Sequence, residues 1–322
     1  MKTINLHHPF EQATVYAGDI VLALGFFDGV HRGHQAVIKA ARDEADRLQL
    51  PLAVMTFNMA PRIMYQQIRP EEVTYLTTLR EKERLMTHLG VDYLYVAQLT
   101  SAFSALKPQE FVDQYMVGLH AKSVVAGFDY TYGKKDLANM QTLIEHAAGR
   151  FNILEVNKLS EDTNKVGSTE IRQDLNTGKI DKANQQLGYI YSNDGIVVHG
   201  EKRGRELGYP TANLMIAAES LIPAEGVYVV EMLLNNQVYP GVASIGNNIT
   251  FGEGRKRTVE IHLLDFKGEI YGEYVTVYWH KYLRPELKFD GIDGLIDQMD
   301  QDAIEARKYL EKLQNLTIDK IK

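Results

Sequence analysis

The hydrophobic pattern changes character near residue 188, and this change limits the folds open to the chain. Before it, short apolar runs such as residues 20–25 alternate with amphipathic stretches at helical spacing. Strand–helix alternation of this kind favours a parallel sheet with helices on both faces. After it, β-branched and aromatic runs follow one another over residues 191–282, which is typical of a small barrel or sandwich. We therefore predict an α/β domain over residues 1–184 and an all-β domain over residues 185–322.

The pattern also predicts individual elements. Strands are expected at residues 20–25, 52–57, 92–99, 122–128 and 152–156. Helices are expected at residues 34–48, 78–89, near 108, 137–147, 169–175 and 179–187. In the second half, Asn235 and Asn236 are typical of a tight hairpin turn. The chain would end in a helix whose buried stripe comprises Ile292, Leu295, Ile296, Met299, Ala303, Ala306 and Leu310.

Composition excludes several classes of protein. The chain has 322 residues, 35 basic and 42 acidic side chains, and no cysteine. The acidic balance gives no general attraction to nucleic acid or to an anionic membrane. The absence of cysteine excludes disulfides, thiolate nucleophiles and cysteine-ligated metals. The longest early apolar run has eight residues, whereas about 20 are needed to span a bilayer. We expect a cytoplasmic protein that acts on small molecules, as a monomer or weak homo-oligomer.

The sequence GFFDGVHRGH, residues 25–34, directly follows the first predicted strand. Gly25 and Gly33 allow the backbone to approach a ligand closely, and the N-terminus of the following helix suits phosphate. His31 and His34 are three residues apart, so both could donate hydrogen bonds to one phosphate. The alternatives are an ordinary loop with two surface histidines, or a zinc site that lacks an evident third ligand.

The sequence GYPTANL, residues 208–214, follows a basic, glycine-rich stretch that contains Lys202. The side-chain oxygens of Thr211 and Asn213 suit Mg²⁺, which prefers hard oxygen ligands, although Mn²⁺ would accept the same ligands. The basic stretch could screen phosphate charge. The alternative is a polar loop with a charged, solvated face.

Both segments resemble motifs of one enzyme family. The first is similar to G-x-F-D-G-x-H-x-G-H of the FMN adenylyltransferase half of bacterial bifunctional riboflavin kinase/FAD synthetases, and the second to the G-x-P-T-A-N signature of riboflavin kinases. Weaker similarities follow in the same order at GFDYTYG, GSTEIR, GVYVV, TVEIHLLDFKGEIYG and LRPELKF. The resemblance covers nearly the whole chain. It implies a Rossmann-like nucleotidyltransferase sheet, followed by a small riboflavin-kinase-type barrel with a C-terminal helix.

The resemblance also implies roles and ligands. ATP would phosphorylate riboflavin to FMN in the second half, with Mg²⁺, and would adenylylate FMN to FAD in the first. His31 and His34 would stabilise the ATP phosphates, and Glu260 would be the general base on the riboflavin hydroxyl. The residues implied on the ATP and phosphate side are Gly25, Asp28, Gly33, Asp129, Ser168, Thr169, Arg172, Lys202, Gly208, Pro210 and Thr211. Asp28 has a structural alternative, in which it supports the loop.

The sequence departs from the family pattern at three places: TFNMAP, Gly167 in place of the first Ser of S-S-T, and GNNITF in place of G-T-x-P-T-F. The family reads T-F-[DE]-P-H-P where this chain reads TFNMAP, residues 56–61. The segment is expected near the flavin subsite of the adenylyltransferase half, which makes Asn58, Met59 and Pro61 the flavin-binding candidates. The departure leaves open an enzyme with a working kinase half only. A flavin-binding regulator without turnover, or a nucleotidyltransferase for another substrate, are further alternatives.

Overall fold

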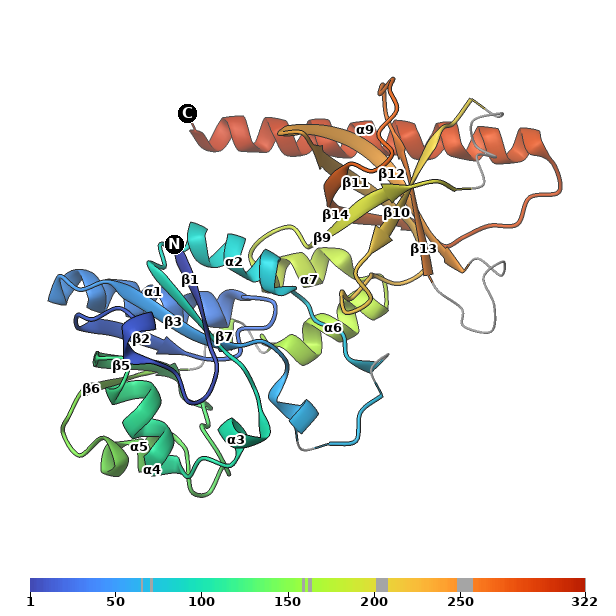
Figure 1. The fold of residues 1–322 in the computed structure, drawn as a ribbon. Helices are drawn as coiled ribbons and strands as arrows, with labels where there is room; N and C mark the ends of the chain where they lie inside the picture. The colour runs from blue at the N-terminus through green and yellow to red at the C-terminus, as the bar shows by residue number, and fades with distance from the viewer. Residues whose placement is uncertain are drawn as a thin grey trace. The chain divides into compact units, whose positions relative to one another are not determined.

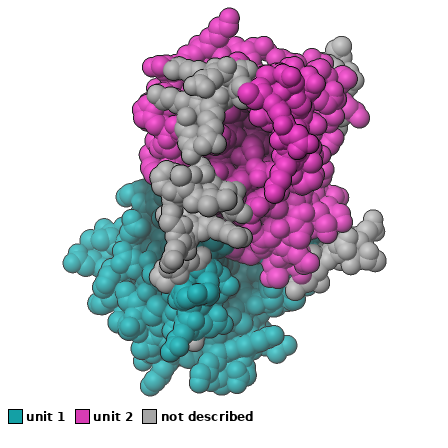
Figure 2. Space-filling model, turned by 90° about the vertical axis from the view of Figure 1, so that its right-hand side faces the viewer, with its two compact units in different colours: residues 1–168 teal, residues 169–322 magenta. Residues whose placement is uncertain are grey.

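The computed structural model describes residues 1–64, 66–69, 72–157, 160–161, 164–200, 208–247 and 257–321. The chain divides into two compact units, Met1–Ser168 and Thr169–Lys322 (Figures 1 and 2). The first unit contains a parallel sheet flanked by helices, and the second contains a closed barrel with one long helix.

The sheet of the first unit has six strands in the order β1-β4-β3-β2-β5-β6, and every neighbouring pair is parallel. The strands are β1 (Lys2–Leu6), β2 (Ile20–Leu24), β3 (Leu52–Phe57), β4 (Tyr93–Ala97), β5 (Ala121–Gly127) and β6 (Asn152–Val156). The predicted parallel sheet is confirmed. The edge strand β1 was not expected. It has five residues and pairs with a single neighbouring strand, so it carries little hydrophobic pattern.

Helices cover both faces of this sheet. Successive side chains of a strand point to opposite faces, and in β2 Leu22 joins one apolar cluster while Val21 joins the other. Residues of α1 and α2 complete the Val21 cluster, and residues of α4, the following π-helical turn and α5 complete the Leu22 cluster. The helices are α1 (Arg32–Leu48), α2 (Leu79–His88), α3 (Ser101–Ser104), α4 (Pro108–Phe111), the π turn (Val112–Val117) and α5 (Met140–Ala147).

The strand order reverses direction at β2. The chain proceeds from β2 to β3 and β4 on one side, and then returns to add β5 and β6 on the other. In open α/β sheets, ligands bind in the crevice at the carboxyl ends of the strands where the order reverses. The loops after β2 and β5 lie at that crevice.

The second unit is an antiparallel barrel, closed in the order β10-β13-β12-β11-β14-β9. Its elements are α6 (Ser168–Asn176), α7 (Ile180–Leu187), β9 (Ser192–Val198), β10 (Thr211–Ile216), β11 (Gly226–Leu234), β12 (Gln237–Asn247), β13 (Arg257–Leu263), β14 (Tyr274–Arg284) and α9 (Ile292–Ile321). The predicted hairpin turn is present between β11 and β12, because Asn235 and Asn236 both have positive φ, 49° and 64°.

The predicted buried stripe of α9 is correct only in part. Ala306 and Leu310 are buried against the barrel, but Ile292 is 59% exposed. Leu295 and Met299 line a cavity instead of a packed core. Helical periodicity identifies an apolar face, but it does not say whether protein or ligand will cover that face.

Candidate active sites

The β2–α1 loop has an unusual backbone. Three of its residues have positive φ: Phe27 at 54°, Gly29 at 82° and Val30 at 35°. Phe27 and Val30 are strained there but fully packed, so the surrounding core enforces the conformation. Gly25 is required as well, because a Cβ at this position would lie 2.8 Å from the Phe27 ring.

The two predicted histidines lie together at the start of α1. His31 is the N-cap residue, and its Nδ1 accepts a hydrogen bond from the His34 backbone N–H at 3.3 Å. The two rings stack with their centroids 3.6 Å apart. A Cβ at Gly33 would lie 3.2 Å from the His31 ring. Both imidazoles are therefore held where the helix N-terminus favours an anion.

His34 is held in its neutral form. Burial, followed by the nearby charges of His31 and Lys82, lowers the pKa of His34 well below its usual value. Its Nδ1 atom is buried and has no hydrogen-bond partner among the described residues. Leaving a buried polar atom without a hydrogen bond costs free energy, so a ligand that forms a hydrogen bond with this nitrogen would remove that cost.

Asp28 supports the loop. It is 5% exposed, and its Oδ1 accepts hydrogen bonds from the backbone N–H groups of Leu76 and Thr77 at 2.9 and 3.3 Å. The Thr77 hydroxyl in turn accepts from the Gly29 N–H at 3.0 Å. Ser168 joins the same loop, since its hydroxyl donates to the Asp28 carbonyl at 2.9 Å. The carboxylate is thus engaged by the protein, as in the structural alternative.

The remaining ATP-side candidates belong to several elements of both units. Asp129 is exposed just beyond the end of β5, at the crevice of the sheet. Thr169 and Arg172 lie on α6, in the second unit. Gly208 is exposed with a φ of 84°. Lys202 lies outside the described residues.

Lys82 is a buried residue of this site that no sequence motif indicates. Its side chain is almost fully buried at the ends of β2 and β3, and its ammonium donates to the Phe26 carbonyl at 2.7 Å and to the Thr56 hydroxyl at 3.2 Å. Burial lowers the pKa of Lys82 to about 8. In the sequence this lysine stands in the charged string LREKER, which is typical of a solvated helix face.

The flavin candidates directly follow β3. The Asn58 Oδ1 accepts a hydrogen bond from the Leu99 N–H at 3.0 Å, and the Asn58 N–H donates to the Ala97 carbonyl at 3.2 Å. Met59 packs against the sheet core, and Pro61 begins a short 3₁₀ turn. The segment therefore connects the ends of β3 and β4. The Asn58 Oδ1 accepts a hydrogen bond that a carboxylate oxygen could equally accept.

Strand register assembles the second site. Thr211 and Asn213 are two residues apart on β10, so both side chains lie on one face. Asn213 is paired with Glu260 of β13. The Thr211 hydroxyl donates to the Glu260 carboxylate at 3.3 Å. Two residues of the GYPTANL motif and one residue of the TVEIHLLDFKGEIYG segment are thus neighbours.

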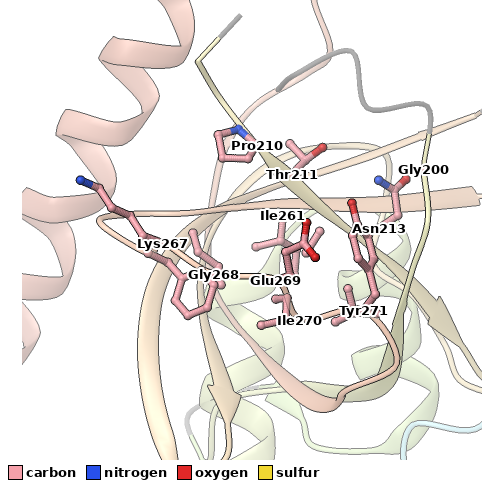
Figure 3. A pocket seen from close by; sticks show the side chains of 14 residues that line it. Gly200, Pro210, Thr211, Asn213, Ile261, Lys267, Gly268, Glu269, Ile270 and Tyr271 are labelled. Carbon is pink, nitrogen blue, oxygen red and sulfur yellow. The ribbon is translucent and has the colours of Figure 1, made fainter. Parts of the chain in front are cut away.

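A first cavity of about 300 Å³ opens beside Asn213. In Figure 3, Thr211 and Asn213 lie along β10, while Glu269 and Tyr271 come from the segment between β13 and β14. Gly200 completes the wall: a Cβ there would lie 2.1 Å from the Asn213 amide nitrogen. Pro210 also lines this cavity.

A second cavity of about 290 Å³ opens beside Glu260. Thr211 lines both cavities. The second has an apolar side, formed by Leu287 and Phe289 of the LRPELKF segment and by Leu295 and Met299 of α9. Long-range packing brings α9 and the segment after β14 to the mouth of the barrel, and no local sequence pattern encodes that approach.

Arginine–carboxylate pairs fasten α9. Arg284 of β14 donates to Asp302 with Nη2–Oδ2 and Nε–Oδ1 distances of 2.7 and 3.0 Å, and Asp302 is buried. Arg307 pairs with Asp265 at the surface.

Within the described ranges, no cluster of three His, Asp or Glu side chains is arranged to hold a metal ion. No described helix is long and apolar enough to cross a bilayer.

Comparison with known proteins agrees with this two-site architecture. A family model described as FAD synthetase matches residues 14–170, and one described as riboflavin kinase matches residues 187–310. A bifunctional riboflavin kinase/FMN adenylyltransferase from Listeria monocytogenes is 47% identical over 98% of this chain and 100% of its own length. The chain belongs to the bifunctional riboflavin kinase/FMN adenylyltransferase family.

Other members and one solved structure extend the similarity. The bifunctional riboflavin kinase/FMN adenylyltransferase from Bacillus subtilis is 40% identical over 98% of this chain and all of its own length. A crystal structure named as a macrolide-efflux protein from Streptococcus pneumoniae aligns with a TM-score of 0.88 and 37% identity. That alignment covers 95% of this chain and 99% of the other. The two-part architecture of the family therefore extends over nearly the whole chain.

Proposed function

We propose that this chain makes FAD from riboflavin in two ATP-dependent steps at two separate sites. The barrel transfers a phosphoryl group from ATP to riboflavin and releases FMN and ADP. The α/β unit transfers an adenylyl group from a second ATP to FMN and releases FAD and pyrophosphate. Membership of the family supports both activities. The observation that carries the proposal is the Thr211–Glu260 contact between two cavities of similar volume.

In the barrel, Glu260 is the general base. It accepts the proton of the riboflavin 5′-hydroxyl as that oxygen attacks the γ-phosphorus of ATP, and the bond from the γ-phosphorus to ADP breaks. The apolar second cavity receives the flavin ring, and the first cavity receives ATP. Support comes from the position of Glu260 on the second cavity and of Asn213 on the first.

The side chains present suit Mg²⁺. The Thr211 hydroxyl and the Asn213 amide oxygen are hard ligands on one strand face beside a carboxylate. When bound, the ion would neutralise charge on the ATP phosphates. Thr211 and Asn213 would hold it, and Gly200 keeps the backbone close to the Asn213 amide.

In the α/β unit, the loop of residues 25–31 and the start of α1 bind the triphosphate. An FMN phosphate oxygen attacks the α-phosphorus, and the bond from the α-phosphorus to pyrophosphate breaks. His31 and His34 stabilise the developing charge. Ser168, Thr169, Arg172 and Asp129 are further phosphate- or ATP-binding residues in this proposal. Support comes from the stacked histidines and from the buried Nδ1 of His34, which has no hydrogen-bond partner among the residues that the structure describes.

The kinase-only alternative has one observation in its favour, which is the sequence TFNMAP. The contacts of Asn58 weaken it, because the amide oxygen supports Leu99 as a carboxylate would. We therefore propose two active domains, with residues 1–184 for adenylyl transfer and residues 185–322 for phosphorylation. We further propose a cytoplasmic enzyme, in keeping with the absence of cysteine, and a monomer or weak homo-oligomer.

The test is to incubate the purified chain with riboflavin, ATP and Mg²⁺ and to separate the flavins by chromatography. FAD is the expected product, over many turnovers per chain. FMN without FAD would support the kinase-only alternative. Binding of flavin without turnover would support the regulator.

A further inference from the structure

A buried lysine lies beneath the β2–α1 loop. Lys82 on α2 is 3% exposed, and it donates to the carbonyl of Phe26 within that loop and to the hydroxyl of Thr56 at the end of β3. Its ammonium also lies 4.4 Å from the centroid of the Phe26 ring. Lys82 therefore joins the loop to the segment that precedes Asn58.

The charge of this lysine is only partly compensated in the free protein. Within the described part of the chain the ammonium of Lys82 donates to a carbonyl and a hydroxyl and forms no ion pair, and the carboxylate of Asp28 acts on it by electrostatic attraction. Burying a cation without a contacting anion is unfavourable. An anion bound in the loop above it would supply the missing negative charge.

We propose that Lys82 is a positioning residue for adenylyl transfer, which fixes the loop through the Phe26 carbonyl and supplies a buried positive charge beneath the ATP phosphates. This inference rests on the proposed FMN adenylyltransferase activity. No motif considered in the sequence contains Lys82. It does not touch the reacting atoms, so it acts through the backbone and through the local potential.

The electrostatics around His34 agree with this role. The charge of Lys82 is one of the causes that lower the pKa of His34, after burial and the charge of His31. The titratable groups that act on this pair come from the loop, as Asp28, and from the N-cap of α1, as His31. The lysine thus helps to keep His34 neutral, so that the positive charge at the site resides on a side chain of α2 that is buried beneath the loop.

The test compares Lys82→Gln and Lys82→Arg with the unchanged full-length chain. Glutamine retains a donor for Phe26 but removes the charge, whereas arginine retains the charge. Each protein is assayed for FMN-to-FAD and for riboflavin-to-FMN conversion, and the second reaction is the internal control. Lys39→Met is the matched control variant, because Lys39 is an exposed lysine on α1 that pairs with Asp43.

Lys82→Gln is expected to lower kcat/KM for ATP in FAD formation by about 100-fold, with the kinase reaction unchanged. Lys82→Arg should recover part of the loss. The pH profile should change as well. Without the charge of Lys82 the pKa of His34 rises, so the acid limb of FAD formation moves to higher pH. The fall in activity as Lys82 loses its proton near pH 8 should also disappear.

Two outcomes would overturn the inference. One is a Lys82→Gln protein with unaltered ATP kinetics and an unaltered pH profile. The other is a parallel loss of both reactions and of thermal stability, which would indicate a purely structural lysine. Failure of the proposed function is a different result, because the unchanged chain would then make no FAD at all.

Discussion

The β2–α1 loop and the β10–β13 strand pair hold their functional side chains by different means. The loop relies on local backbone geometry, with strained residues packed in a core and with glycines at positions that admit no Cβ. The strand pair relies on register, because Asn213 and Glu260 are far apart in sequence and face each other across a sheet. A site of the first kind is sensitive to its immediate neighbours, and one of the second kind depends on the whole barrel.

The largest effects are expected from substitutions that remove the reacting side chain of one site and leave the other site unchanged. Glu260→Gln should reduce FMN formation by about 10²- to 10⁴-fold and leave FMN-to-FAD conversion intact, because its carboxylate serves only the barrel. His34→Ala should reduce FAD formation by about 10²- to 10³-fold and leave the kinase intact. Steady-state assays of both reactions on each variant provide the measurement.

Far-ultraviolet circular dichroism would verify that both variants fold. If either substitution removed both activities from a folded protein, the two sites would not be independent.

Gly200→Ala should have a smaller effect on the kinase. The added Cβ would meet the Asn213 amide, so the side chain must move. A displacement of about 1 Å near a reacting group can cost about 100-fold, and we expect a 10- to 100-fold fall in kcat/KM for riboflavin phosphorylation. Gly291→Ala is the matched control, because its Cβ would meet no atom within 4 Å. Equal activities of the two variants would contradict the role given to Gly200.

The dependence of the second site on the barrel can be measured as stability. Asp302→Ala leaves Arg284 without its partner, and breaking a buried pair costs about 3–5 kcal/mol. Because neither group is wholly enclosed, we expect a loss near the lower end. Trp279 is the only tryptophan and is fully buried in the barrel, so its fluorescence during urea unfolding reports on this unit. Asp265→Ala, which breaks a surface pair, should shift the curve less.

The smallest effect is expected at TFNMAP, which departs from the family pattern. Asn58→Asp keeps an oxygen that accepts from Leu99, so KM for FMN should change by less than about threefold, which corresponds to roughly 0.6 kcal/mol. The measurement is FMN-dependent FAD formation at saturating ATP. A large gain in activity would show that this segment limits the adenylyltransferase half.

Local patterns were sufficient for much of the fold. Alternation of buried strands with amphipathic helices predicted the parallel sheet, and the paired asparagines predicted the β11–β12 turn. The short edge strand β1 was missed because its hydrophobic pattern is weak. The final helix was predicted, but Leu295 and Met299 of its predicted buried stripe line a cavity, because periodicity cannot distinguish a protein partner from a ligand.

The sequence by itself determined which residues can perform the chemistry, because glycine spacing, paired histidines and the PTAN string are local requirements of phosphate and metal binding. Only the tertiary structure decided their surroundings. It buried Lys82 beneath the loop, paired Thr211 with Glu260, and brought α9 to the second cavity. These are contacts between residues distant in sequence. They arise from packing and strand register, which a local sequence pattern does not encode.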